Sequence, residues 1–430
     1  MKIIKIRDKA AERVVTQLER RGRVNIEAVE DKVKEIVKTV KRTGDKALIK
    51  YTKFFDKADF AKIGFKVSKS EFKDAYKKLS KEQIDAIRDA SRNIKLFHSR
   101  QFQELDFEET VRGVEIATIL RPIRRVGVYI PGGKAVYPSS VLMTVIPARV
   151  AGVKEIFMCS PPDSEGKVDP AVLVAAEESS ATAVFKVGGA QAIAAMAYGT
   201  ETVPKVDKVV GPGNIYVTAA KILVSRDVDI DNPAGPSEIM ILADDYANPE
   251  FIAADLIAQC EHGQDSLALV TTTSDSLATR IVQNLKLIKE KAGRKREIDK
   301  ALKNNCWIFL TENLNEAVEL VNRIAPEHLE IMVKHPVNVL KKTENAGAIF
   351  LGEYSPVAAG DYAAGLNHVL PVGGYAKTLS GLSIRDFTKT IAVVSCSIEG
   401  LANLEKTVNV LASIEGFEEH AKSISVRLKR

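Results

Sequence analysis

Apolar side chains recur every three or four positions in the first part of the chain, with charged residues between them. The pattern is clearest at residues 29–53 and 81–104, and its period is that of an amphipathic helix. We therefore predict that residues 8–107 are mainly helical. His98 lies in this region without a nearby carboxylate or a second type of metal ligand, which favours a structural role for its imidazole.

From Arg121 onward, short apolar runs alternate with helical patterns. Residues 125–130 read as a strand, residues 131–140 as a glycine-rich turn and residues 140–150 as a helix. Three more strand and helix pairs follow, at 155–159 with 171–178, 183–187 with 190–198, and 208–210 with 215–224. This repeat predicts a parallel sheet with helices on its faces. Small ligands bind such sheets in the loops at the carboxyl ends of the strands.

Two of these loops are rich in glycine, at residues 188–191 and 211–214. Each leads into a predicted helix whose free N–H groups could hold a phosphate, although close packing of the helix explains the glycines equally well. Neither loop is a G-x-G-x-x-G, and that fingerprint occurs nowhere in the chain. Ser237 precedes a predicted strand at 238–242, where it either contacts a ligand or turns the chain.

A second α/β unit begins with a helix at residues 249–261. Predicted strands at 267–270, 307–311, 330–333 and 348–351 alternate with helices such as 275–291 and 315–324. The end of the chain differs, because residues 384–396 are rich in strand-forming residues and residues 397–430 are helical and then extended. A tail too small to own a core packs on something larger, which in a homodimer is the other subunit.

Several polar residues of the second unit suggest chemistry. Gln259 and His262 are three apart and share a face at the end of a helix, so they are either half of a metal ligand set or a helix cap. Asp361 follows a glycine and is a hard oxygen donor suited to zinc or a similar divalent ion. Glu327 and His328 are adjacent proton acceptors, and the local sequence leaves open whether they act together.

Composition narrows the class of protein. Hydrophobic residues make up 45% and charged residues 27% of the 430 residues, which is typical of a globular protein too long for one simple core. The net charge of +6 is modest, and the densest basic run, residues 286–303, is interleaved with acidic residues. We therefore expect no nucleic-acid partner. The four cysteines form no C-x-x-C pair, and no apolar run reaches the length of a membrane span. These features predict a cytoplasmic protein without a membrane anchor.

Taken together, the segments resemble the histidinol dehydrogenase family. The resemblance covers about residues 121–420 and rests on an ordered set of motifs at 129–133, 137–143, 187–193, 210–217, 234–238, 258–262, 325–330, 360–371 and 415–420. Each motif alone is weak, but the ordered set is highly specific. The chain departs from the family pattern at Gly263, where many members have Asp, and at Phe417, where Leu is usual. Neither residue is a proposed ligand.

The resemblance implies an α/β fold with two Rossmann-like domains, whose parallel-sheet cores lack the G-x-G-x-x-G fingerprint. It adds a helical N-terminal segment and an extended C-terminal tail. The expected domains are a helical arm at 1–28, a first α/β domain from 29–128 and 239–381 with the metal and catalytic residues, a second α/β domain at 129–238 with the NAD loops, and a dimerisation tail at 382–430.

The resemblance also implies a reaction. It is the NAD-dependent, zinc-dependent four-electron oxidation of L-histidinol to L-histidine through bound L-histidinal, the last steps of histidine biosynthesis. Glu327 and His328 would be the acid–base residues. One zinc ion per subunit would be held by Gln259, His262, Asp361 and His420. In a homodimer with exchanged tails, His420 would come from the partner.

The same resemblance gives the binding residues. Histidinol would be contacted by Ser237, Gln259, His262, His328, Asp361, His368, Glu415 and His420. NAD would be held by Tyr129, Gln191 and Asn214.

Four other functions are open on the sequence alone. A relative acting on another alcohol, such as a sulfonated diol, would keep the metal and NAD residues but change the substrate contacts, whereas His368 and Glu415 are both present. A zinc hydrolase would use Glu327 to activate water and would leave the NAD loops unexplained. Cys260 could act as a thiol nucleophile, although its only basic neighbour is His262. A non-catalytic binding protein would not need an adjacent Glu and His beside metal ligands.

Overall fold

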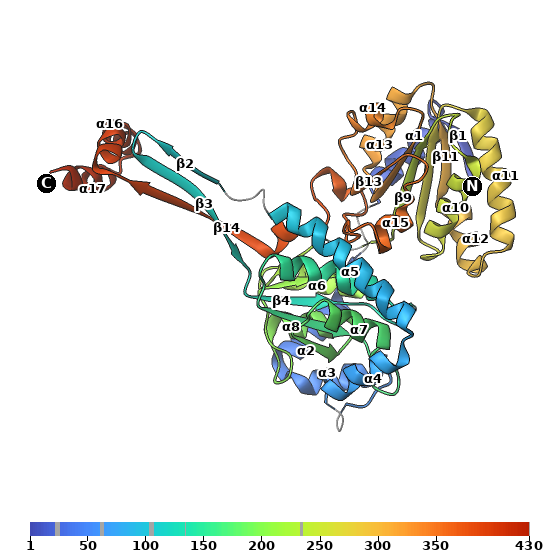
Figure 1. The fold of residues 1–430 in the computed structure, drawn as a ribbon, viewed down its shortest axis with the longest axis horizontal. Helices are drawn as coiled ribbons and strands as arrows, with labels where there is room; N and C mark the ends of the chain where they lie inside the picture. The colour runs from blue at the N-terminus through green and yellow to red at the C-terminus, as the bar shows by residue number, and fades with distance from the viewer. Residues whose placement is uncertain (22–25, 61–63, 103–106, 134, 233–234, 430) are drawn as a thin grey trace.

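The protein consists of two α/β lobes and a long arm that projects from one of them (Figure 1). The computed structural model describes residues 1–21, 26–60, 64–102, 107–133, 135–232 and 235–429. Lys134 and Ala234, which belong to two of the quoted segments, lie outside the described residues. Each lobe is built on a parallel sheet, which confirms the predicted α/β class.

The first lobe contains a six-stranded sheet in which every pairing is parallel. Its strands, in spatial order, are β1 (Lys2–Lys5), β11 (Cys306–Leu310), β10 (Leu267–Thr272), β9 (Glu238–Ala243), β12 (His328–Met332) and β13 (Ala348–Leu351). Its helices are α1 (Lys9–Glu19), α10 (Pro249–Cys260), α11 (Asp275–Glu290), α12 (Lys295–Asn304), α13 (Leu314–Ile324), α14 (Pro336–Leu340) and α15 (Val357–Tyr362). β9, β10 and β12 are buried along their whole length. Helices cover both faces of a sheet of this kind, so its central strands are nearly continuous apolar runs.

The second lobe contains a five-stranded parallel sheet. Its strands, in spatial order, are β6 (Ala183–Lys186), β5 (Glu155–Ser160), β4 (Arg125–Tyr129), β7 (Lys208–Val210) and β8 (Asp229–Ile230). The crossover helices are α6 (Pro138–Val150), α7 (Pro170–Glu178), α8 (Gly189–Tyr198) and α9 (Ile215–Val224). Both glycine-rich loops lead into helices, α8 and α9, as predicted.

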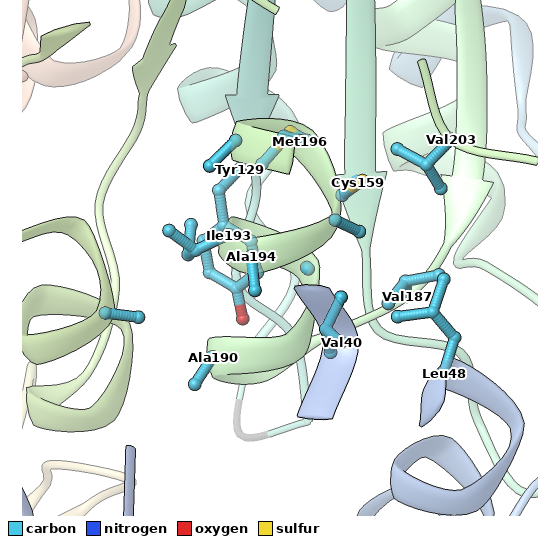
Figure 2. Close-up of a cluster of buried hydrophobic side chains, with 14 of the residues drawn as sticks. Val40, Leu48, Tyr129, Cys159, Val187, Ala190, Ile193, Ala194, Met196 and Val203 are labelled. Atoms are coloured by element: carbon cyan, nitrogen blue, oxygen red, sulfur yellow. The ribbon is translucent and has the colours of Figure 1, made fainter. Parts of the chain in front are cut away.

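The N-terminal helices divide between the lobes differently from the prediction. α2 (Glu27–Thr43), α3 (Asp45–Phe55), α4 (Lys69–Lys78) and α5 (Lys81–Phe102) pack on helices α6 to α9 of the second lobe. Figure 2 shows part of this core, where Val40 and Leu48 join Ile193, Met196 and Tyr129. The grouping of residues 29–128 with 239–381 was therefore wrong for residues 29–102. An amphipathic period predicts a buried helix face but not the sheet that covers it.

The first residues are also more than a helical arm. β1 pairs with β11 at the edge of the six-stranded sheet, and α1 packs on α13 through Val15 and Leu18. The segment at 1–21 is thus an integral part of the first lobe. The polar sequence Lys-Ile-Ile-Lys gave no strand signal of the usual length.

The arm is a three-stranded antiparallel sheet tipped by two helices (Figure 1). It contains β2 (Phe107–Val111), β3 (Val114–Pro122), β14 (Thr388–Cys396), α16 (Ile398–Glu415) and α17 (Glu418–Leu428). Large apolar side chains remain exposed on it, namely Ile116, Ile391, Val393, Val394, Ile398, Leu404, Val410, Leu411, Ile414, Phe417 and Val426. Exposed apolar surface of this extent marks an interaction face.

Candidate active site

The site begins where α13 ends. Ala325 adopts the left-handed conformation (φ 49°, ψ 68°) that stops the helix, and Pro326 cannot continue it. Glu327 and His328 then enter β12, whose first residue is His328. β12 starts two residues earlier than predicted, so the two proton acceptors lie at the amino end of a central strand.

Glu327 is buried and held at one carboxylate oxygen. Its Oε2 accepts hydrogen bonds from the Ser237 hydroxyl and from the Glu238 backbone N–H, both at 2.8 Å. Burial raises the pKa of Glu327 to about 7, against the lowering effects of His328 and of these two hydrogen bonds. The carboxyl group can therefore gain or lose a proton near neutral pH.

His328 lies against the carboxyl groups of Glu327 and Asp361. Its Nδ1 is 3.5 Å from Glu327 Oε2 and donates a hydrogen bond of 2.9 Å to the Glu238 carbonyl. Its Nε2 is 3.5 Å from Asp361 Oδ1. Burial alone would lower the pKa of His328, but the two carboxyl groups outweigh it and raise the pKa to about 9.

Two of the predicted metal ligands, His262 and Asp361, lie near each other, and Gln259 precedes His262 by three residues. α10 runs back along the sheet, so its carboxyl end brings Gln259 and His262 to the amino ends of β9 and β12. α15 presents Asp361, whose pKa burial would raise but the neighbouring imidazoles of His328, His368 and His262 lower. Desolvation lowers the pKa of His262. A neutral imidazole and an ionised carboxylate are the forms that bind metal ions.

These residues fit a divalent cation. Gln259 is buried, and its side-chain nitrogen has no hydrogen-bond partner in the described chain. Within the described residues, no group of three or more His, Cys, Asp or Glu side chains is assembled as a metal site. A single chain would supply an amide oxygen, an imidazole and a carboxylate from Gln259, His262 and Asp361, which is one ligand short of tetrahedral zinc coordination.

His368 joins the two lobes beside this cluster. Its Nδ1 donates to the Asp361 carbonyl at 3.0 Å, so its Nε2 accepts from the Ser140 hydroxyl of α6 at 3.2 Å. The neighbouring Asn367 donates to the Met143 carbonyl at 2.6 Å. His368, which was predicted to contact the substrate, therefore lies where the first lobe meets the second. Sequence reasoning missed Ser140, because a serine in a helix carries no signal of its own.

The predicted NAD residues line the carboxyl edge of the five-stranded sheet. The Tyr129 hydroxyl accepts the Gly189 N–H at 3.1 Å, and burial raises the pKa of Tyr129 to about 12, so its proton remains available. Gln191 is buried with neither side-chain polar atom bonded to a described residue. An unpaired buried amide fits a polar ligand. Asn214 instead caps α9, accepting from Tyr216 N–H and Val217 N–H at 3.0 and 3.2 Å.

Packing accounts for part of the glycine content of these loops. A Cβ on Gly211 would lie 2.1 Å from the Tyr129 carbonyl oxygen, and one on Gly188 would lie 2.6 Å from Pro161. Both glycines are therefore required by the fold itself. The phosphate-binding interpretation of the two loops gains no support from them.

Two predicted residues are not part of this cluster. Glu415 and His420 lie on α16 and at the start of α17, exposed at the tip of the arm and remote from both lobes (Figure 1). Cys260 is also unsuited to the thiol mechanism, because its buried sulfur lies 3.7 Å from that of Cys306 in the core. No helix in the described part of the chain is long and apolar enough to cross a membrane.

The fold and site together define an α/β enzyme with a buried glutamate and histidine suited to acid–base chemistry, beside side chains of the kinds that bind zinc. The family model for histidinol dehydrogenase matches residues 19–428. Histidinol dehydrogenase of Methanocaldococcus jannaschii is 47% identical over 410 residues, which cover 95% of each chain. That of Methanococcus maripaludis is 45% identical and covers 99% of this chain and all of its own length.

A solved structure agrees with these relatives. The crystal structure of histidinol dehydrogenase from Elizabethkingia anophelis superposes with a TM-score of 0.95 at 39% identity, covering 100% of this chain and 98% of the other. The chain belongs to the histidinol dehydrogenase family and is an oxidoreductase.

Proposed function

We propose that this protein oxidises L-histidinol to L-histidine in two consecutive steps, using two NAD and one bound zinc ion. The observation that carries the proposal is the buried pair of Glu327 and His328, with Asp361 against the imidazole and Ser237 against the carboxyl group. Near-full-length similarity to curated histidinol dehydrogenases supports the choice of substrate.

The overall reaction balances as follows. The primary alcohol loses two electrons and becomes the aldehyde, the aldehyde adds water, and the hydrate loses two more electrons to become the carboxylate. Two NAD are reduced to two NADH and three protons are released for each histidinol. NAD, when bound, accepts the hydride from the reacting carbon at each step.

His328 is proposed as the base of the first step. Its Nδ1–H is committed to the Glu238 carbonyl, so only Nε2 can exchange a proton with the substrate. Nε2 is buried and has no hydrogen-bond partner in the described chain. A general base must reach the proton that it removes, and this nitrogen faces the side on which Asp361 lies.

Glu327 is proposed to take the proton from water in the second step. With a pKa of about 7, its carboxylate is a stronger base than an exposed glutamate and can also return the proton near neutral pH. Ser237 and the Glu238 N–H hold one of its oxygens, and they also aim the carboxyl group.

The zinc ion would be held by Gln259, His262, Asp361 and His420 of a second copy. When bound, it would fix the substrate near the nicotinamide and stabilise negative charge on oxygen. The exposed apolar residues of the arm support a homodimer in which each tail covers the other subunit. Tyr129, Gln191 and Asn214 are proposed to hold NAD. Gln191 is the best supported of the three, because its buried side-chain amide has no hydrogen-bond partner in the described chain.

The stoichiometry of NADH tests the proposal. Purified protein with zinc, limiting L-histidinol and excess NAD should form two NADH for each histidinol, with histidine as the product. One NADH would mean that the aldehyde escapes and that Glu327 lacks the proposed role. No NADH would favour another alcohol, such as a sulfonated diol, or the hydrolase alternative.

A further inference from the structure

Residue 238 holds both members of the acid–base pair through its main chain. The Glu238 N–H donates to Glu327 Oε2 at 2.8 Å, and the Glu238 carbonyl accepts from His328 Nδ1 at 2.9 Å. The position of this one peptide segment therefore decides where the Glu327 carboxyl group and the free nitrogen of His328 point.

The Glu238 side chain is anchored in turn by Arg21. The carboxyl group is 5% exposed and accepts Arg21 Nε–H at 2.7 Å and Nη2–H at 2.6 Å, one on each oxygen. The Gly373 N–H adds a third bond at 3.0 Å. This two-pronged geometry fixes direction as well as distance, and lysine cannot reproduce it.

The remaining N–H groups of Arg21 donate to main-chain carbonyls of α1 and of the end of α13. Nη1 donates to the Leu18 and Ile324 carbonyls at 2.7 and 2.9 Å, and Nη2 also donates to the Ala325 carbonyl at 3.4 Å. Ile324 is the last residue of α13 and Ala325 is its C-cap, three and two residues before Glu327. All five donors of the guanidinium are therefore used.

We propose that Arg21 is a positioning residue for the acid–base pair, acting through Glu238 and through the end of α13. It joins the N-terminal segment to the starts of β9 and β12, and it is not one of the residues proposed to contact substrate or cofactor. The inference rests on the proposed function in that Glu327 and His328 are taken as the acid–base residues.

A cavity makes the inference testable by chemical rescue. An opening of about 150 Å³ is lined by Arg21, Glu238, Gln17, Pro236 and Trp307. Replacing Arg21 by alanine would enlarge this opening, so that a methylguanidinium ion could enter and bind the Glu238 carboxylate.

The experiment compares Arg21→Ala, Arg21→Lys and the control Arg20→Ala, since Arg20 is the exposed neighbour. We expect kcat for histidinol oxidation to fall ~100-fold in Arg21→Ala and ~10-fold in Arg21→Lys, with KM for NAD within about twofold of wild type, because small misplacements of reacting groups are costly. Millimolar methylguanidinium should recover ~10-fold of the Arg21→Ala loss and nothing in the control.

Hydrogen–deuterium exchange in the absence of substrate gives a second readout. Arg21→Ala should exchange faster than wild type in peptides covering β9 and β12, and methylguanidinium should restore protection.

Wild-type kcat and wild-type exchange in Arg21→Ala would overturn the inference. A loss of kcat in a folded variant that methylguanidinium cannot rescue would also overturn it. If Arg21→Ala does not fold, Arg21→Lys decides through the same two measurements. Failure of the wild-type protein to oxidise histidinol would refute the proposed function, and exchange alone would then decide the role of Arg21.

Discussion

Two carboxyl groups and one imidazole set the proton balance of the site. Without a metal ion, burial opposes the charge on His328, yet Glu327 and Asp361 raise its pKa to about 9, so the ring is protonated at neutral pH. A cation bound by Asp361 would engage that carboxylate and repel the imidazolium, which lowers the pKa of His328. Zinc binding to the metal-free protein should therefore release about one proton from this residue near pH 8.

Calorimetry in buffers with different ionisation enthalpies measures this release. The apparent binding enthalpy should depend on the buffer in the wild-type protein and in His335→Gln, because His335 lies on another part of the lobe. The dependence should weaken by about one proton in His328→Asn. Equal proton release in wild type and His328→Asn would contradict the expected linkage.

The Glu327 carboxyl group offers a second prediction at this scale. Glu327→Gln keeps an oxygen that can accept from Ser237 and Glu238, but an amide cannot take a proton from water. Oxidation of histidinal should therefore slow by ~10²–10⁴-fold, the usual contribution of a general base. Oxidation of histidinol should slow less. Single-turnover NADH formation with each substrate compares the two steps. Equal slowing of both would assign Glu327 to orientation only.

The position of a single helix could be predicted where apolar residues within that helix recur with helical spacing. The apolar spacing predicted the bounds of α10 to within one residue. Gln259 lies in its last turn, but His262 lies two residues beyond its end, so their shared face stays a prediction. The partner of each helix was not predictable in this way. α2 to α5 have clear amphipathic faces, but nothing local in them distinguishes the five-stranded sheet from the six-stranded one. Arg21 also gave no signal, because its partners Glu238 and Ile324 lie more than 200 residues away in the sequence.

A buried carboxyl group and a partly buried one link three elements below the site. Glu330 of β12 accepts the Val357 N–H at the start of α15 at 2.9 Å, and its other oxygen has no donor in the described chain. Asp255, one turn before Gln259 on α10, lies against it. Burial raises the pKa of Asp255 to about 6. Burial, and to a smaller extent the negative charge of Asp255, raise the pKa of Glu330 well above its usual value.

This pair should make stability depend on pH in a definite direction. An acid whose pKa is raised by folding stabilises the native state fully below its unfolded pKa, and this contribution is lost as pH rises through the folded pKa. The free energy of unfolding of the metal-free protein should therefore fall less between about pH 4 and pH 7 in Glu330→Gln than in wild type. Urea titrations at each pH check this, with the exposed Glu344→Gln as control. A decline as steep in Glu330→Gln as in wild type would contradict a raised pKa of Glu330 in the folded protein.

At the scale of the whole molecule, one chain does not bring its four predicted metal ligands together. Gln259, His262 and Asp361 lie in the first lobe, whereas His420 lies at the tip of an arm that projects away from both lobes (Figure 1). The sequence allowed a tail that packs on another subunit, because residues 382–430 are too few for a core of their own. It could not predict that β2 and β3, from the middle of the chain, would pair with β14 to carry that tail.

Mixing two inactive variants tests the exchange directly. In a homodimer with exchanged tails, Asp361→Ala and His420→Ala each disable both sites when pure. A mixed dimer has one site with neither change, because the intact Asp361 of one chain meets the intact His420 of the other. Random reassociation of equal amounts should therefore restore about 25% of wild-type activity, since half of the dimers are mixed and each has one intact site of two. If His420 served its own chain, every site in the mixture would keep one defect and activity would stay at the level of the pure variants.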